Sequence, residues 1–164
     1  MLTLIRFALV GLFFWSWASV AHADAAVPLV TLDKDGQAVA SEEAPEIVKQ
    51  AVEAGNKLVG KPYKYGGGHG TFNDTGYDCS GAASFLLREI GAMKGVRSSG
   101  GFFEFGEKGE GKYVTVWVRK GHVFVTVAGL RFDTQGQVAS DGPRWTSKVR
   151  DTKKFQARRL PAWK

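Results

Sequence analysis

The residue best suited to do chemistry is Cys79, the single cysteine of the 164-residue sequence. It begins segment 79–90, where apolar residues recur at helical spacing, so it is predicted to lie at a helix N-terminus. Free backbone N–H groups and the helix dipole there favour a thiolate over a thiol. The same groups could hold an oxyanion, which makes Cys79 a candidate nucleophile. The alternative is an inert buried cysteine that packs as a small hydrophobic residue.

A thiol nucleophile needs a base, and His122 is the better placed of two candidate histidines. It begins segment 122–127, a predicted strand whose alternation puts three valines on one face and His122 on the other. If Ala128 and Gly129 form a hairpin turn, the return strand places Asp133 on the face of His122, one diagonal step away. A carboxylate there could orient the imidazole and stabilise imidazolium. The pattern predicts the shared face and leaves the register open.

His69 is the rival base, in a glycine-rich loop ten residues before Cys79. Nothing in the sequence orients it toward the thiol, so local hydrogen bonding and a place in the substrate cleft are its alternatives. Asp78, next to the nucleophile, is favoured as a helix cap over a catalytic acid. The histidines and scattered acids form no cluster with metal-ligand spacing, so neither a metal nor another cofactor is expected.

Three motifs of this sequence resemble the NlpC-like family of cell-wall cysteine peptidases. They are KPYKYGG at 61–67, YDCSG at 77–81 and GHV at 121–123. The resemblance spans about residues 45–145, and it implies a compact papain-like fold and cleavage of peptide bonds in peptidoglycan stem peptides. Matched by position, Cys79 corresponds to the family's nucleophile and His122 to its base.

The resemblance also implies a binding region around the nucleophile. Tyr63 corresponds to the tyrosine that supports the oxyanion region, and Asp78, Ser80 and His69 are assigned to the oxyanion or substrate-binding region. Many family members have a second histidine as the orienting residue, where this chain has Asp133; a carboxylate can do the same task.

Two further stretches differ from the family pattern or extend it. The usual glycine–acid stretch before the base strand is replaced by Trp-Val-Arg-Lys at 117–120. This replacement bears on the local strand geometry and on substrate specificity. The glycine-rich loop over 92–111 is expected to form part of the cleft wall.

The segments that must position these residues predict an α+β fold, with helices packed on an antiparallel sheet. A first helix is expected after residues 41–45, where a capping serine, two acids and a proline precede a helical period, and 60–62 should end it. The second helix covers 79–90, with Gly91 as its stop. Strands are expected at 113–118, 122–127 and 130–134.

The N-terminal residues predict export. A basic residue precedes the apolar run 7–20, and Ala-His-Ala at 21–23 has the pattern of a cleavage site, so 1–23 is predicted to be a signal peptide. Retention as an anchor is the alternative, although the run is shorter than the ~20 residues that span a bilayer. Residues 24–40 are expected to be a poorly ordered leader before the peptidase domain, 41–164. The protein would work in the periplasm or at the cell wall.

The formal charge of +6 is concentrated in residues 144–164, which contain eight basic residues and one acidic residue. This segment is expected to be a basic tail that attracts anionic wall polymers or is simply solvated. A single cysteine excludes internal disulfides and multi-thiolate zinc sites. Segment 106–113 has P-loop spacing but precedes a strand and has Tyr113 where serine or threonine should bind magnesium, so no nucleotide is expected.

The leading hypothesis is an exported cysteine endopeptidase in which Cys79 attacks a peptide carbonyl, His122 moves the proton and Asp133 orients His122. A related thiol acyltransferase or amidase would use the same three residues. The non-enzymatic alternative is a basic wall-binding module whose binding weakens with salt. The expected partners are peptidoglycan stem peptides, with anionic wall polymers as additional partners. A monomer is expected, with no nucleic-acid or nucleotide partner.

Overall fold

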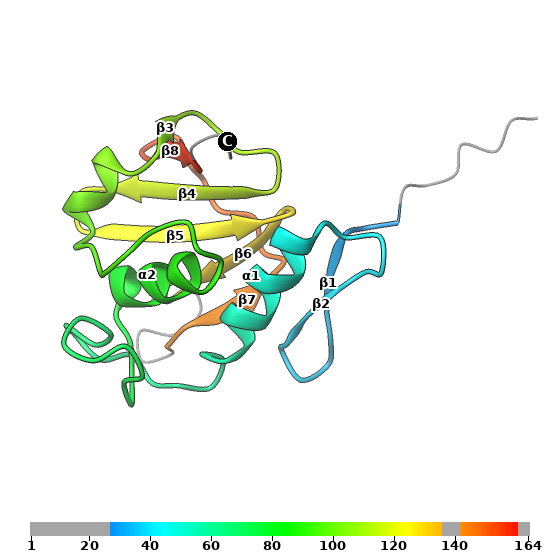
Figure 1. The fold of residues 1–164 in the computed structure, drawn as a ribbon, viewed down its shortest axis with the longest axis horizontal. Helices are drawn as coiled ribbons and strands as arrows, with labels where there is room; N and C mark the ends of the chain where they lie inside the picture. Colours follow the sequence, from blue (N-terminus) through cyan, green and yellow to red (C-terminus); the bar gives the residue numbers. More distant parts are fainter. Residues whose placement is uncertain (1–26, 136–141, 161–164) are drawn as a thin grey trace, which may run out of the picture.

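The computed structural model describes residues 27–135 and 142–160. In these residues, helices pack with antiparallel strands (Figure 1), which confirms the predicted α+β class. The predicted signal peptide lies outside the described residues. In chain order the elements are β1 (Val30–Leu32), β2 (Ala38–Ala40), α1 (Glu46–Asn56), α2 (Cys79–Glu89), the 3₁₀ helix η1 (Gly100–Glu104), β3 (Glu107–Lys108), β4 (Val114–Arg119), β5 (His122–Val127), β6 (Leu130–Asp133), β7 (Arg144–Thr146) and β8 (Gln156–Arg159).

The larger sheet has the strand order β3-β8-β4-β5-β6-β7, and every neighbouring pair is antiparallel. Figure 1 shows α1 and α2 on the same face of this sheet, with the β1–β2 hairpin beside α1. The other face carries the side chains that alternate with the core valines. We call it the outer face.

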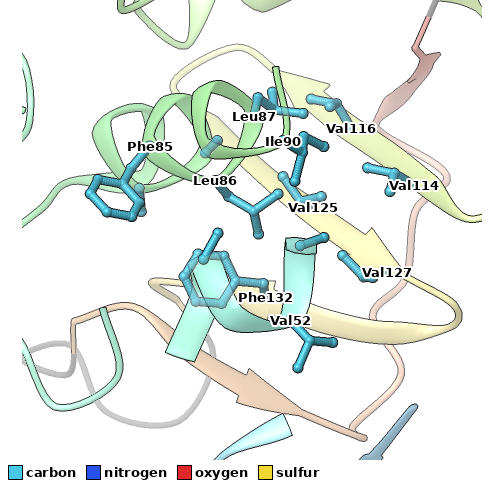
Figure 2. Packing of buried hydrophobic residues seen from close by; sticks show 14 of the residues in the cluster. Val52, Phe85, Leu86, Leu87, Ile90, Val114, Val116, Val125, Val127 and Phe132 are labelled. Carbon is cyan, nitrogen blue, oxygen red and sulfur yellow. The ribbon is translucent and has the colours of Figure 1, made fainter. Parts of the chain in front are cut away.

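The core lies between the helices and the sheet. Alternation in β4 and β5 points Val116 and Val125 toward α2, into the same cluster as Leu86, and all three side chains are fully buried (Figure 2). Burying one such side chain contributes roughly 1.5–3 kcal/mol. Phe132 of β6 joins the same cluster and links it to α1. This packing holds α2 against β5 and thereby sets where the N-terminus of α2 points.

The β5–β6 hairpin forms as predicted. Its turn residues, Ala128 and Gly129, have φ angles of 46° and 88°, as a two-residue primed turn requires. The pairing of Val125 with Phe132 and of neighbouring residues sets the register that the pattern left open. In this register Asp133 lies on the outer face.

The two helices differ in how well the sequence located them. α2 begins at Cys79 as predicted, and Gly91 follows it with a φ of 69°. α1 begins at Glu46 and has no side-chain cap, so the prediction of Ser41 as its cap is wrong. Ser41 accepts a bond from Ala44 N–H in a separate turn, which keeps it away from the free N–H groups of α1. α1 also ends at Asn56, before the predicted stop at 60–62.

The prediction of a poorly ordered leader over 24–40 is wrong for its described part, which forms the β1–β2 hairpin. Asp33 closes the turn, because its Oδ1 accepts bonds from the N–H groups of Asp35 (2.9 Å) and Gln37 (2.8 Å). Asn56 of α1 then bonds both backbone groups of Ala38, at 3.0 and 2.9 Å. Three-residue strands are too short to show an alternation in the sequence.

The prediction of a basic tail over 144–164 is also wrong for its described part, because β7 and β8 are strands of the large sheet. Arg158 donates from Nε to the carbonyl oxygen of Phe105 at 2.6 Å, and Arg159 forms an ion pair of 2.7 Å with Glu107. Much of the positive charge that the sequence assigned to a tail therefore meets internal partners.

The expected long loop over 92–111 contains η1 and β3. Phe102 and Phe105 are buried in the core, with ring centroids 5.8 Å apart. These phenylalanines pack the loop against the sheet. A role for the loop as a cleft wall stays a prediction.

Candidate active site

The candidate nucleophile, Cys79, is the first residue of α2 and is partly exposed. Asp78 caps the helix, because its Oδ1 accepts a hydrogen bond of 2.7 Å from Gly81 N–H. The cap interpretation of Asp78 is therefore confirmed. Capping uses one of the free N–H groups at the helix end, while the apolar face of α2 anchors the helix on the sheet.

The glycine-rich loop packs directly on the first turn of α2. Tyr77 N–H donates to Pro62 O at 3.1 Å, and Lys64 N–H donates to Tyr77 O at 3.2 Å, so the two motifs lie side by side. A Cβ on Gly81 would overlap the carbonyl oxygen of Gly67. Only glycine permits this close approach. The KPYKYGG and YDCSG motifs thus form one packed unit at the helix end.

The electrostatic surroundings of Cys79 differ from the prediction. Burial raises the pKa of the thiol, hydrogen bonds from the N–H groups of Val123 and Ser80 lower it, and the charges of Asp78 and Asp133 raise it further. The net shift is upward, so the expectation of a thiolate favoured by the helix end is not met, because burial outweighs the N–H groups. The bond from Val123 places the sulfur at the start of β5.

His122 and Asp133 meet as the shared face predicted. His122 Nε2–H donates to Asp133 Oδ1 at 2.9 Å, and both side chains are fully buried. The other ring nitrogen, Nδ1, has no hydrogen-bond partner among the described residues. His122 directly precedes Val123, whose N–H contacts the sulfur of Cys79. One ring nitrogen is thus committed to the carboxylate, and the other makes no hydrogen bond within the described residues.

Sequence reasoning missed the groups that hold Asp133. Arg150 donates from Nη1 to Asp133 Oδ2 at 2.7 Å, and Gln135 N–H donates to Oδ1 at 2.9 Å. Arg131 Nε lies 3.7 Å from Oδ2. Arg150 is far from Asp133 in the chain and sits in an irregular segment, so no sequence pattern could have connected the two.

Aromatic rings enclose the imidazole. Phe155 meets His122 edge-on at 6.2 Å between ring centroids, and Phe124 lies 6.3 Å away in a stacked orientation. The Arg150 guanidinium lies over both phenylalanine rings, 5.3 to 5.5 Å from their centroids. The irregular segment between β7 and β8 therefore covers the His122–Asp133 pair and keeps water from it.

His69 is oriented by Asp78 and Ser80, two residues that the resemblance assigns to the same region. Its Nε2 lies 3.1 Å from both Asp78 Oδ1 and Ser80 Oγ, and Ser80 Oγ donates to the same carboxylate oxygen at 3.0 Å. The structure thus gathers His69, Asp78 and Ser80 at the start of α2. A role for His69 as base or in substrate binding stays a prediction.

Tyr63 lies within electrostatic range of the candidate nucleophile, Cys79. Burial raises the pKa of its hydroxyl, and the proximity of Cys79 and Asp78 adds to this rise. Tyr63 is still 37% exposed, so part of the residue is open to solvent. The predicted role of Tyr63 in the oxyanion region stays a prediction.

No protein-family model matches the chain, and no curated protein matches it in sequence. A solved structure does match: the P60 domain of an antigen from M. avium subspecies paratuberculosis, with a TM-score of 0.54. The fold is that of a P60 domain. The match covers 70% of this chain and 96% of the P60 domain, at 18% sequence identity. At that identity the likeness establishes the papain-like fold and leaves the activity to chemical argument.

In the described part of this P60-like chain, no helix is long and apolar enough to cross a membrane. In the same residues, no three His, Cys, Asp or Glu side chains gather as a metal site.

Proposed function

We propose that this protein is an exported cysteine endopeptidase that hydrolyses peptide bonds in peptidoglycan stem peptides. One arrangement carries the proposal. Cys79 is the first residue of α2, and its sulfur accepts a hydrogen bond from Val123 N–H at the start of β5, the strand that contains His122. His122 is in turn hydrogen-bonded to the buried Asp133. The P60 fold supports the reaction class. The three sequence motifs support the substrate class.

The reaction begins from a neutral thiol, because burial raises the pKa of Cys79. His122 Nδ1 takes the thiol proton as the sulfur attacks the carbonyl carbon of the scissile bond. Asp133 keeps the proton of the neutral imidazole on Nε2, which leaves Nδ1 as the acceptor, and then stabilises the imidazolium. The oxyanion that forms is met by backbone N–H groups of the first turn of α2 and by the Tyr63 hydroxyl.

The tetrahedral intermediate collapses when His122 returns its proton to the leaving amine. The C–N bond breaks, and the acyl group remains on the Cys79 sulfur as a thioester. Water then attacks the thioester, with His122 as base, and the sulfur leaves with the proton to restore the thiol. Acylation and deacylation use the same base and oxyanion donors. Because the thioester forms on the Cys79 sulfur, removing Cys79 abolishes both steps.

The test is digestion of purified peptidoglycan sacculi by the protein, Cys79→Ala and Cys79→Ser, followed by separation of the soluble fragments and labelling of new amino termini. We expect fragments and new amino termini with the wild type alone. Glu43→Gln, on an exposed turn residue, is the matched control and should retain full activity. Equal fragment release by wild type and Cys79→Ala would overturn the proposal.

The same experiment separates the two alternative functions. A thiol acyltransferase given an amine acceptor would form a new amide and few free carboxyl ends. A non-catalytic wall-binding module would sediment with sacculi in a salt-dependent way, and Cys79→Ala would sediment equally. Export is tested by comparing the N-terminus of the protein recovered from its host with the predicted cut after Ala23.

A further inference from the structure

A cavity of about 290 Å³ opens on the outer face of the sheet, and neither Cys79 nor Tyr63 lines it. Its floor is formed by the outward side chains of β4, β5 and β6, among them Trp117, Phe124 and Arg131. The segment after β7, which includes Lys148 and Arg150, forms one wall. The volume is close to the lower end of the range for small-molecule sites.

A buried cation faces this cavity. The side chain of Arg131 is only 7% exposed, and its Nε has no hydrogen-bond partner among the described residues. The nearby carboxylate, Asp133, lies 3.7 Å away and already accepts hydrogen bonds from His122, Arg150 and the Gln135 N–H. Burial lowers the pKa of Arg131, which reflects the cost of this charge. A guanidinium in this position lacks a full counter-charge.

Most of the other charged residues in the lining are positive as well. Lys148 and Arg150 add two cations, and Glu110 is the one acidic residue of the lining. Within the described ranges, Glu110 forms no ion pair within 4.0 Å of Arg131, Lys148 or Arg150. The cavity therefore attracts an anion from solution.

The floor offers an apolar plate beside these charges. Trp117 and Phe124 are stacked with centroids 6.1 Å apart and planes 14° from parallel. Trp117 Nε1 donates to Thr126 Oγ1 at 3.0 Å, so its polar atom is satisfied and its ring can contact an apolar group. We propose that this cavity binds a small carboxylate-bearing ligand, with the carboxylate on Arg131 and Arg150 and its planar or apolar part on Trp117.

This binding site goes beyond the proposed hydrolysis and does not require it. Its two arginines also face Asp133, whose other oxygen accepts the bond from His122. A bound carboxylate would therefore share its guanidinium partners with the residue that orients the base. Cys79→Ala should still bind the ligand, so failure of the peptidase proposal and failure of this proposal give different results.

The experiment uses three probes of one shape: benzoate, the neutral benzamide and the cation benzylamine. Binding is measured by titration calorimetry and by amide chemical shifts, with the wild type and with Cys79→Ala. We expect benzoate to bind at least about tenfold more tightly than benzamide, because charged hydrogen bonds are lost in the amide. Benzylamine should not bind. Shifts should centre on Trp117, Phe124 and Arg131.

Variants of the lining decide the role of each charge. Arg131→Gln and Lys148→Gln should weaken benzoate binding, and Glu110→Gln should strengthen it, because a competing negative charge is removed. Lys148 and Glu110 are exposed, so their variants remain informative even if Arg131→Gln does not fold.

Phenyl phosphate, measured beside benzoate, distinguishes a carboxylate ligand from a phosphate ligand, and tighter binding of the phosphate would overturn the carboxylate assignment. Equal binding of benzoate and benzamide, or none at millimolar concentration, would overturn the site.

Discussion

Arg150 and Asp133 are joined by a hydrogen bond of 2.7 Å between Nη1 and Oδ2. The other oxygen of Asp133 accepts the bond from His122, so the carboxylate is held from both sides. A carboxylate that is hydrogen-bonded at both oxygens has little freedom to rotate, so it also fixes the orientation of the imidazole that donates to it. A residue of the segment between β7 and β8 thus positions the candidate base on β5.

This relationship predicts that Arg150→Gln lowers kcat by about tenfold to a hundredfold with little change in KM, because small displacements of a base are costly. Arg150→Lys keeps the charge and should recover part of the loss. Steady-state kinetics on a stem-peptide substrate provide the measurement. Arg150 is a positioning residue, so an unchanged kcat in folded Arg150→Gln would contradict the assignment.

The raised pKa of Cys79 predicts how alkylation depends on pH. A higher pKa means that less thiolate is present at any given pH, so the rate of iodoacetamide reaction should reach half its maximum above pH 9.0, the usual value for this group. Asp78→Asn removes a charge that raises the pKa and keeps a capping side chain, so its midpoint should fall. Full reactivity near neutral pH would indicate a preformed thiolate–imidazolium pair and contradict this account.

The contact between Gly81 and Gly67 predicts an unusual effect of alanine in a helix. Alanine normally stabilises a helix relative to glycine by about 1 kcal/mol. Here a Cβ would overlap the Gly67 carbonyl, so Gly81→Ala should lower the free energy of unfolding by about 1–3 kcal/mol. Gly70→Ala, which has open space, is the control and should change it by less than about 0.5 kcal/mol. Urea denaturation measures both, and equal stabilities would refute the packing argument.

The N-terminal hairpin is predicted to depend on Asn56. Asn56→Ala removes two hydrogen bonds to the backbone of Ala38, so β1 and β2 should lose about 1–2 kcal/mol of protection against hydrogen exchange. Gln50→Ala, on the same helix, removes a bond to Glu46 only and should leave the hairpin unchanged. Identical exchange rates in β1 and β2 for both variants would show that Asn56 does not hold the hairpin.

Local signals explain why the region around α2 and the β5–β6 hairpin could be predicted. The helix is bounded by Asp78 and Gly91, and the hairpin has a long alternating strand and a two-residue turn. Each of these signals involves residues that are close in the chain. Since alternation also determines which face a side chain occupies, the meeting of His122 with Asp133 followed from the same pattern.

The wrong predictions concern segments whose structure depends on more than local sequence. β1, β2, β7 and β8 have three or four residues each, too few for a period to emerge, and β8 pairs with β3 and β4, which lie far away in the chain. In the sequence alone, the arginines of these strands resemble a solvated basic segment, because their bonding partners lie elsewhere in the chain. The rise in the pKa of Cys79 could not be predicted from the sequence either, because burial is a property of the whole fold.

The sequence by itself predicted the helix that begins at Cys79, the β5–β6 hairpin and the meeting of His122 with Asp133, because these depend on spacing along a short stretch of chain. Only the tertiary structure decided that Arg150 holds Asp133, that Phe155 covers His122 and that burial raises the pKa of the Cys79 thiol. All three depend on contacts and burial between segments that are far apart in the chain, and a local sequence pattern carries no information about such contacts.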